Sequence, residues 1–180
     1  MPKSEADFPL TLSQVNKLSE LAFAYHDEAD ACARQQICLS SCIMIAASLE
    51  AMLITAVCVF CDEVSQTPFV ATGSLKLRNL LKWTLADLLK VTKEAQLLPE
   101  RLNLRAELDR RPVKDPVQTD KILHVRNLLH PGRCVREGSQ NLITREELGI
   151  LYASCHAAYD YLGQKLIAKY PSLPPIKTTL

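Results

Sequence analysis

Apolar residues recur at helical spacing along most of the chain. From Leu10 to Thr67 there is neither Gly nor Pro, and the many helix-forming residues predict one or two long helices. The run HDEAD at 26–30 predicts a break, with Asp27 or Asp30 as the N-cap of a second helix that reaches about Asp62. The first helix should bury one apolar stripe, formed by Leu12, Val15, Leu18, Ala22 and Tyr25.

The second helix is apolar nearly all round, which is typical of the central helix of a bundle. Its stretch CIMIAASLEAMLITAVCVFC, Cys42 to Cys61, is also as long as a membrane span. Glu50 lies near the middle, where a charge costs roughly 2.5–3.5 kcal/mol in a bilayer. We therefore interpret the stretch as a buried core helix and expect no membrane partner. Glu50 should have a structural role, either protonated or paired with Arg78 or Arg126.

The next part of the pattern predicts three shorter helices. Ser74 is placed to cap the third helix, and Pro99 to open a fourth that runs to about Arg110. Asp115 and Pro116 should cap and open the fifth. The buried stripe of the third helix should consist of Leu77, Leu80, Leu81, Leu85, Leu88 and Leu89.

The fifth helix should end at His130, because a Pro-Gly pair follows. Thr144 and Glu147 form a capping-box pattern that opens the last helix, and Pro171 closes it. The apolar stripe of this last helix is Leu148, Leu151, Tyr152, Cys155, Tyr159, Leu162 and Leu166.

No segment shows sustained alternation of apolar and polar residues bounded by turn-forming residues. The sequence therefore predicts an all-α fold without a sheet. With 180 residues, 48% of them hydrophobic, the chain suits a single-domain helical bundle of five to six helices. We expect an N-terminal extension at 1–9, the bundle at 10–170 and a C-terminal tail at 171–180.

Charge and cysteine content narrow the range of functions. The 21 basic and 20 acidic residues leave a formal charge of +1, so any nucleic-acid site must be local. The seven cysteines are an odd number, and the start MPKSEADFPL lacks the pattern of a signal peptide. These features favour reduced thiols and a cytoplasmic location.

Two cysteine or histidine sets resemble metal-ligand patterns. One set is Cys38, Cys42, Cys58 and Cys61, which lie in continuous helical sequence and are better explained as small buried hydrophobes. The other combines Cys134 with His124 and His130, but the two histidines project about 120° apart around a helix. We therefore expect no metal and no cofactor.

The strongest candidate for chemistry is HVRNLLHPGR, at 124–133. On a helix, Arg126 and His130 stand one above the other at the edge of the apolar face, and Asn127 flanks them. Histidine can take or give a proton near neutral pH, and arginine binds phosphate oxygens with a planar fork. Arg133 and Arg136 in the following loop add positive charge for an RNA phosphate. One histidine cannot fill both proton roles in one step, so a symmetric homodimer that supplies two copies would be the economical arrangement.

The order of elements, with AASLEAMLI (46–54) in an early core helix and VRNLLHPGR near the end of a later one, resembles the HEPN superfamily of helical bundles. The resemblance covers roughly residues 10–170. It implies a metal-independent endoribonuclease of a toxin or defence system, working as a homodimer on RNA and partnered by an antitoxin or another regulatory protein. By the same resemblance, Arg126, Asn127 and His130 are the catalytic positions.

The spacing within the motif departs from the family. Only three residues separate Arg126 from His130, at least one fewer than is usual, which rotates the histidine by about 100°. The alternative is a catalytically inactive, HEPN-like interaction or regulatory module, in which the same residues close a helix or bind a partner. The sequence RNLLK at 78–82 shows that Arg-Asn-Leu-Leu also occurs in this chain without a following histidine. An unrelated helical scaffold is the third alternative.

Overall fold

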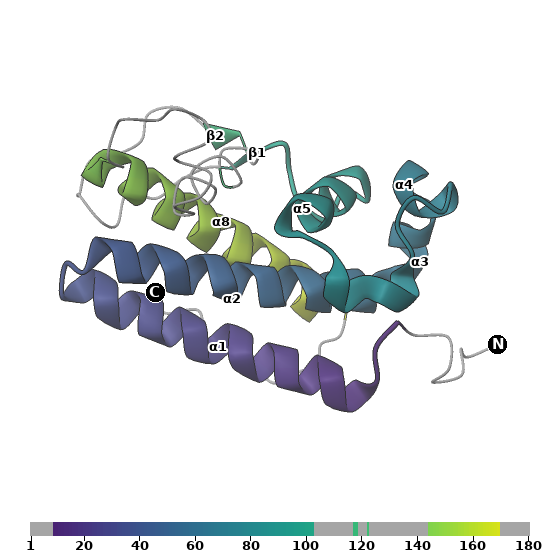
Figure 1. Cartoon of the computed structure of the whole chain (residues 1–180), viewed down its shortest axis with the longest axis horizontal. Helices are drawn as coiled ribbons and strands as arrows, with labels where there is room; N and C mark the ends of the chain where they lie inside the picture. The colour runs from purple at the N-terminus through teal and green to yellow at the C-terminus, as the bar shows by residue number, and fades with distance from the viewer. Residues whose placement is uncertain (1–8, 103–116, 119–121, 123–143, 170–180) are drawn as a thin grey trace.

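The structure is a computed structural model that describes residues 9–102, 117–118, 122 and 144–169. It is an all-α helical bundle, as predicted, built on three long helices (Figure 1). These are α1 (Leu12–Arg34), α2 (Cys38–Val59) and α8 (Arg145–Lys169). Shorter elements follow α2: α3 (Cys61–Ser65), α4 (Pro68–Ala71), the 3₁₀ helix η2 (Leu77–Lys82) and α5 (Leu85–Glu94).

The long helices run side by side, with α2 packed against both α1 and α8. A tight turn reverses the chain between α1 and α2, and α8 begins at the same end of the bundle (Figure 1). Contacts at the two ends of α8 show the direction in which this helix runs. Near its start, Arg145 donates a hydrogen bond to the Gln36 side chain at 3.5 Å, and near its end Lys169 lies 2.7 Å from Glu63. Thus α8 runs antiparallel to α1.

Helix α2 forms the centre of the core, as its apolar composition predicts. Alanines 22 and 29 of α1 are fully buried, and Ser48 of α2 donates a 2.7 Å hydrogen bond to the Ala22 carbonyl oxygen. These small residues let the two backbones approach closely. Among the described helices, α2 alone is long and apolar enough to cross a membrane, with a mean hydropathy of 2.2 over its best window. In the fold, 72% of that window is buried by protein, as in the core helix of a bundle.

The predicted break at 26–30 is wrong, because α1 continues through it to Arg34. The chain instead reverses at Gln36, which has a positive φ of 61°. Backbone N–H groups of Gln36 and Ile37 donate to the carbonyls of Ala33 and Cys32, which is the pattern of a Schellman C-cap. Glycine usually takes this left-handed position, and a glutamine there gives no sequence signal. The predicted apolar stripe also starts too early, since Leu12 is 65% exposed.

The predicted third helix is divided in two. Residues 77–82 form a 3₁₀ helix interrupted at Asn79, and the chain is extended at Trp83. The buried Trp83 indole donates to the Lys76 carbonyl oxygen at 3.3 Å. Helix α5 then begins with a capping box between Thr84 and Asp87. The strong cap at Thr84 replaces the one predicted at Ser74.

The predicted starts of the fourth and fifth helices are also corrected. Strand β1 (Arg101–Leu102) pairs in antiparallel fashion with β2 (Val117–Gln118), so both positions are extended rather than helical. This two-residue ladder contradicts the expectation of no sheet, although it is too small to change the fold class. By contrast, the last helix is confirmed: Thr144 and Glu147 form the predicted capping box.

Candidate functional site

The predicted catalytic residues Arg126, Asn127 and His130 lie outside the described residues, together with Arg133 and Arg136. The described residue nearest to this motif is Ile122, which is helical and fully buried. A buried helical residue at this position is compatible with the apolar face expected of the predicted fifth helix. The roles assigned to the motif remain predictions.

Glu50, the predicted structural residue, lies on α2 and is half-buried. Of its two predicted partners, Arg78 is exposed on η2, and Arg126 lies outside the described residues. Its pairing with either arginine therefore stays a prediction.

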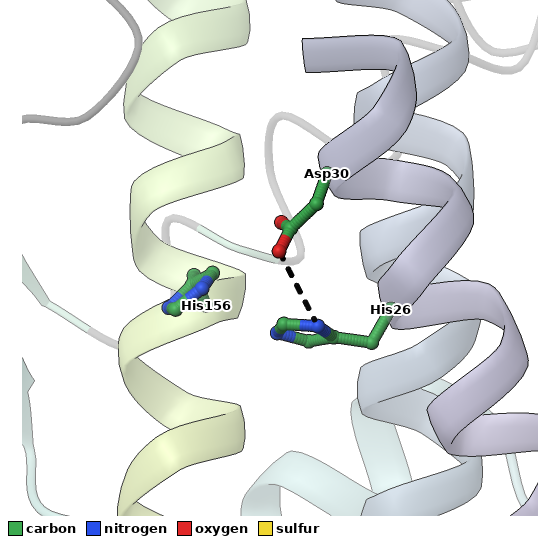
Figure 2. A group of neighbouring side chains, drawn as sticks. All are labelled: His26, Asp30 and His156. Carbon is green, nitrogen blue, oxygen red and sulfur yellow. Dashed lines mark ion pairs between the residues drawn. The ribbon is translucent and has the colours of Figure 1, made fainter. Parts of the chain in front are cut away.

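The structure brings together a different polar cluster, between α1 and α8. His26 and Asp30 lie one turn apart on α1, and His156 faces them from α8 (Figure 2). Each of these residues offers one atom suited to bind a metal ion, and these atoms all lie within 4.8 Å of one another. Because α1 and α8 are antiparallel, His156 lies close to two residues of α1, Asp30 and His26, that precede it by 126 and 130 positions in the sequence. We call His26, Asp30 and His156 the α1–α8 cluster.

Neighbouring side chains orient the members of the α1–α8 cluster. The Tyr152 hydroxyl donates a short hydrogen bond to Oδ1 of Asp30, while Oδ2 of Asp30 lies 3.8 Å from Nδ1 of His26. On α8, Nδ1 of His156 lies 3.2 Å from Oδ2 of Asp160, one turn further along. Each histidine therefore has a carboxylate one helical turn beyond it, spaced so that the two side chains lie on the same face.

Aromatic packing holds the His26 ring in place. The Tyr159 ring centre lies 4.5 Å from that of His26, and the His156 ring centre lies 4.9 Å away. Tyr159 is 2% exposed and His26 is 5% exposed, so both belong to the core. Two polar atoms at this packing contact, His26 Nε2 and the Tyr159 hydroxyl, are buried without a hydrogen-bond partner in the described part of the chain.

Burial sets the charge state of His26 in the α1–α8 cluster. Desolvation lowers the pKa of His26 from its ordinary value of 6.5, and the nearby His156 lowers it further, against the opposing effect of Asp30. The pKa of Tyr159 is raised by burial, with Asp160 adding to the effect. Near neutral pH, His26 is thus an uncharged imidazole that carries one lone pair, and such an imidazole can bind a metal or accept a proton.

The lowered pKa of His26 predicts a pH-dependent stability in chelator-treated protein. When a histidine pKa is lower in the folded than in the unfolded chain, the unfolded chain binds more protons, so stability rises with pH. The stabilisation is present above pH 6.5 and is lost as the pH falls towards the folded-state pKa. Urea unfolding between pH 5 and pH 8 should show this loss, and His26→Gln should reduce it. An unchanged pH dependence in the His26→Gln variant would contradict the assignment of this loss of stability to His26.

The cysteines considered as a zinc set do not form one site. Cys42 and Cys58 lie 16 positions apart on the single helix α2, which separates them by about 24 Å. Burial raises the pKa of the Cys42 thiol to about 12, and it also raises the pKa of the Cys58 thiol. Both thiols are buried in the core and protonated, as the sequence interpretation expects of small hydrophobes.

Sequence reasoning missed the α1–α8 cluster because it assigned Asp27 and Asp30 to a helix break. One signal was present: the spacing His-x3-Asp occurs twice, as His26 with Asp30 and as His156 with Asp160. On a helix this spacing places both side chains on one face. That the two pairs face each other follows only from the antiparallel packing of α1 and α8.

Comparison with known proteins gives no match at any level: no family model matches the chain, no curated protein is significantly similar in sequence, and no solved structure is significantly similar in fold.

Proposed function

We propose that the chain is an HEPN-like, RNA-directed domain that cleaves RNA without a metal ion. The observation that carries the proposal is the motif VRNLLHPGR, in which Arg126, Asn127 and His130 precede a Pro-Gly pair where the sequence predicts a helix end. The all-α bundle, with a long apolar core helix and a long last helix, is compatible with the fold that the resemblance implies.

The motif residues would divide the chemistry of cleavage by the neighbouring 2′-hydroxyl. The 2′ oxygen forms a bond to phosphorus while the bond from phosphorus to the 5′ oxygen breaks. His130 of one copy takes the 2′-hydroxyl proton, and His130 of a second copy gives a proton to the leaving 5′ oxygen. Arg126 stabilises the negative charge on the phosphate, and Asn127 helps to position it. Arg133 and Arg136 bind neighbouring phosphates, and a homodimer supplies the two histidines.

A catalytically inactive interaction module is the second candidate function. The short spacing between Arg126 and His130 favours it, because the rotated histidine would not reach the same point as in the family motif. In that case the motif would bind RNA or a regulatory protein, such as an antitoxin, without cleaving RNA. Under either candidate we propose a cytoplasmic location, which rests on the reduced thiols expected from the sequence.

RNA cleavage in the presence of a chelator tests the proposal. Purified full-length protein is incubated with end-labelled single-stranded RNA in EDTA, and the products are resolved on a gel. Fragments that end in a 2′,3′-cyclic phosphate, together with resistance of a DNA strand of the same sequence, would support cleavage by the 2′-hydroxyl. Intact RNA that is nevertheless bound by the protein would favour the interaction module. Cleavage of the DNA strand would contradict the proposed chemistry.

A further inference from the structure

We propose that the α1–α8 cluster is a binding site for one divalent transition-metal ion of the zinc class, held by His26, Asp30 and His156. Three ligand atoms of the appropriate kind already lie within 4.8 Å of one another. They come from two helices that both pack on α2. The inference does not depend on the proposed RNA chemistry, because it involves none of the motif residues.

An independent feature of His26 points to a ligand at this place. Its Nε2 atom is buried, and no described residue forms a hydrogen bond with it. His26 as a whole is 5% exposed, so bulk water does not compensate this atom. Figure 2 shows the Nδ1 side of the ring facing Asp30 and its other end directed towards α8, where His156 lies. A metal ion between the helices would bind the Nε2 lone pair that the fold otherwise leaves unused.

The distances suit a site that closes on an ion. Zinc binds imidazole nitrogen and carboxylate oxygen at about 2.0–2.2 Å, which places ligand atoms about 3.4 Å apart in a tetrahedral site. From separations of up to 4.8 Å, the side chains need to move inward by about 1 Å. His26 projects from α1 towards α8 (Figure 2), and the ring centres of His26 and His156 lie 4.9 Å apart.

The residues around the α1–α8 cluster supply the outer contacts that metal sites require. Tyr152 donates to Oδ1 of Asp30, which leaves Oδ2 to bind the ion. Asp160 lies 3.2 Å from Nδ1 of His156, so a proton on Nδ1 would be donated to Asp160 and Nε2 would carry the lone pair. Carboxylate, histidine and metal are commonly arranged in this order, and the outer carboxylate fixes the orientation of the ring.

The ligand types determine which ions fit. Two imidazoles and one carboxylate suit zinc, cobalt or ferrous iron, whereas magnesium and calcium prefer sites made of oxygen alone. Three protein ligands leave a fourth position for water or an anion. An ion bound here would also join α1 to α8 across the face of α2, so that metal binding would stabilise the bundle.

Zinc titration of the chelator-stripped, full-length protein tests the proposal. We expect one zinc ion per chain by calorimetry. The Tm should rise by about 5–10 °C when zinc is at about 100 times its Kd. Magnesium at the same concentration should leave Tm unchanged. Cobalt should give visible absorption bands without the intense near-ultraviolet bands of cobalt bound to thiolate, which separates this site from the cysteines.

Variants identify the ligands. His26→Gln and His156→Gln should each weaken zinc binding by about 100-fold or more, and Asp160→Asn, which acts through His156, by about 10–100-fold. Glu28→Gln is the matched control, because Glu28 is an exposed acid on α1 outside the α1–α8 cluster, and it should bind zinc like the parent protein. Circular dichroism and melting of each metal-free variant confirm that it folds. The proposal is overturned if the parent protein binds no zinc, or if both histidine variants bind it as tightly as the parent.

Discussion

Replacing His130 with alanine is expected to lower the rate of RNA cleavage by about 10²–10⁴-fold, the usual contribution of a general acid or base. Both proton transfers should become slower, the one from the 2′-hydroxyl and the one to the leaving 5′ oxygen, because each copy of the proposed homodimer supplies one His130. The rate is measured with end-labelled RNA in EDTA under single-turnover conditions. Gel filtration of the variant shows whether its oligomeric state is unchanged.

The chain contains a matched control for the motif. Arg126 and Arg78 each open an Arg-Asn-Leu-Leu stretch, and Arg78 is exposed on η2. Arg126→Ala should reduce cleavage, because it removes a charge that stabilises the phosphate in the transition state. Arg78→Ala should leave cleavage unchanged. Equal rates in the parent protein and in His130→Ala would refute the catalytic assignment.

The second large effect is expected in the core. Leu49 is fully buried in the middle of α2, and truncation of such a leucine to alanine removes apolar contacts and leaves a cavity. We expect Leu49→Ala to lower the free energy of unfolding by about 2–5 kcal/mol. Urea denaturation followed by circular dichroism measures this change.

Leu39 provides the comparison on the same helix. It is 52% exposed, so Leu39→Ala removes little buried surface and should change the free energy of unfolding by less than about 1 kcal/mol. If the two alanine variants lost similar stability, α2 would not be the central helix of the bundle. Such a result would also favour the alternative interpretation of α2 as a membrane span.

The fold class could be predicted because apolar periodicity reports directly on which helix faces are buried. The central position of α2 followed from its composition, and the start of α8 followed from the Thr144 capping box. The end of α1 could not be predicted, because Gln36 adopts a left-handed conformation that usually belongs to glycine. The strand positions at 101–102 and 117–118 were also missed, since two-residue pairings depend on tertiary contacts and carry no periodic signal.

The candidate sites differ in what the sequence could reveal. Arg126, Asn127 and His130 are close in sequence, so helical geometry alone predicts that they lie at one helix edge, and this stays a prediction. His26 and His156 lie on the first and last long helices, and only the antiparallel packing of α1 and α8 brings their rings to 4.9 Å. A site of this kind depends on tertiary structure and could not be located from local spacing.

RNA binding by the intact protein tests the central functional claim most directly. Fluorescence anisotropy with a labelled RNA whose 2′ positions are methylated measures binding without cleavage. We predict saturable binding that weakens as salt is raised. Binding should also weaken in an Arg126→Ala, Arg133→Ala, Arg136→Ala triple variant. Absence of binding at low salt, or equal binding by the triple variant, would contradict an RNA-directed site at this motif.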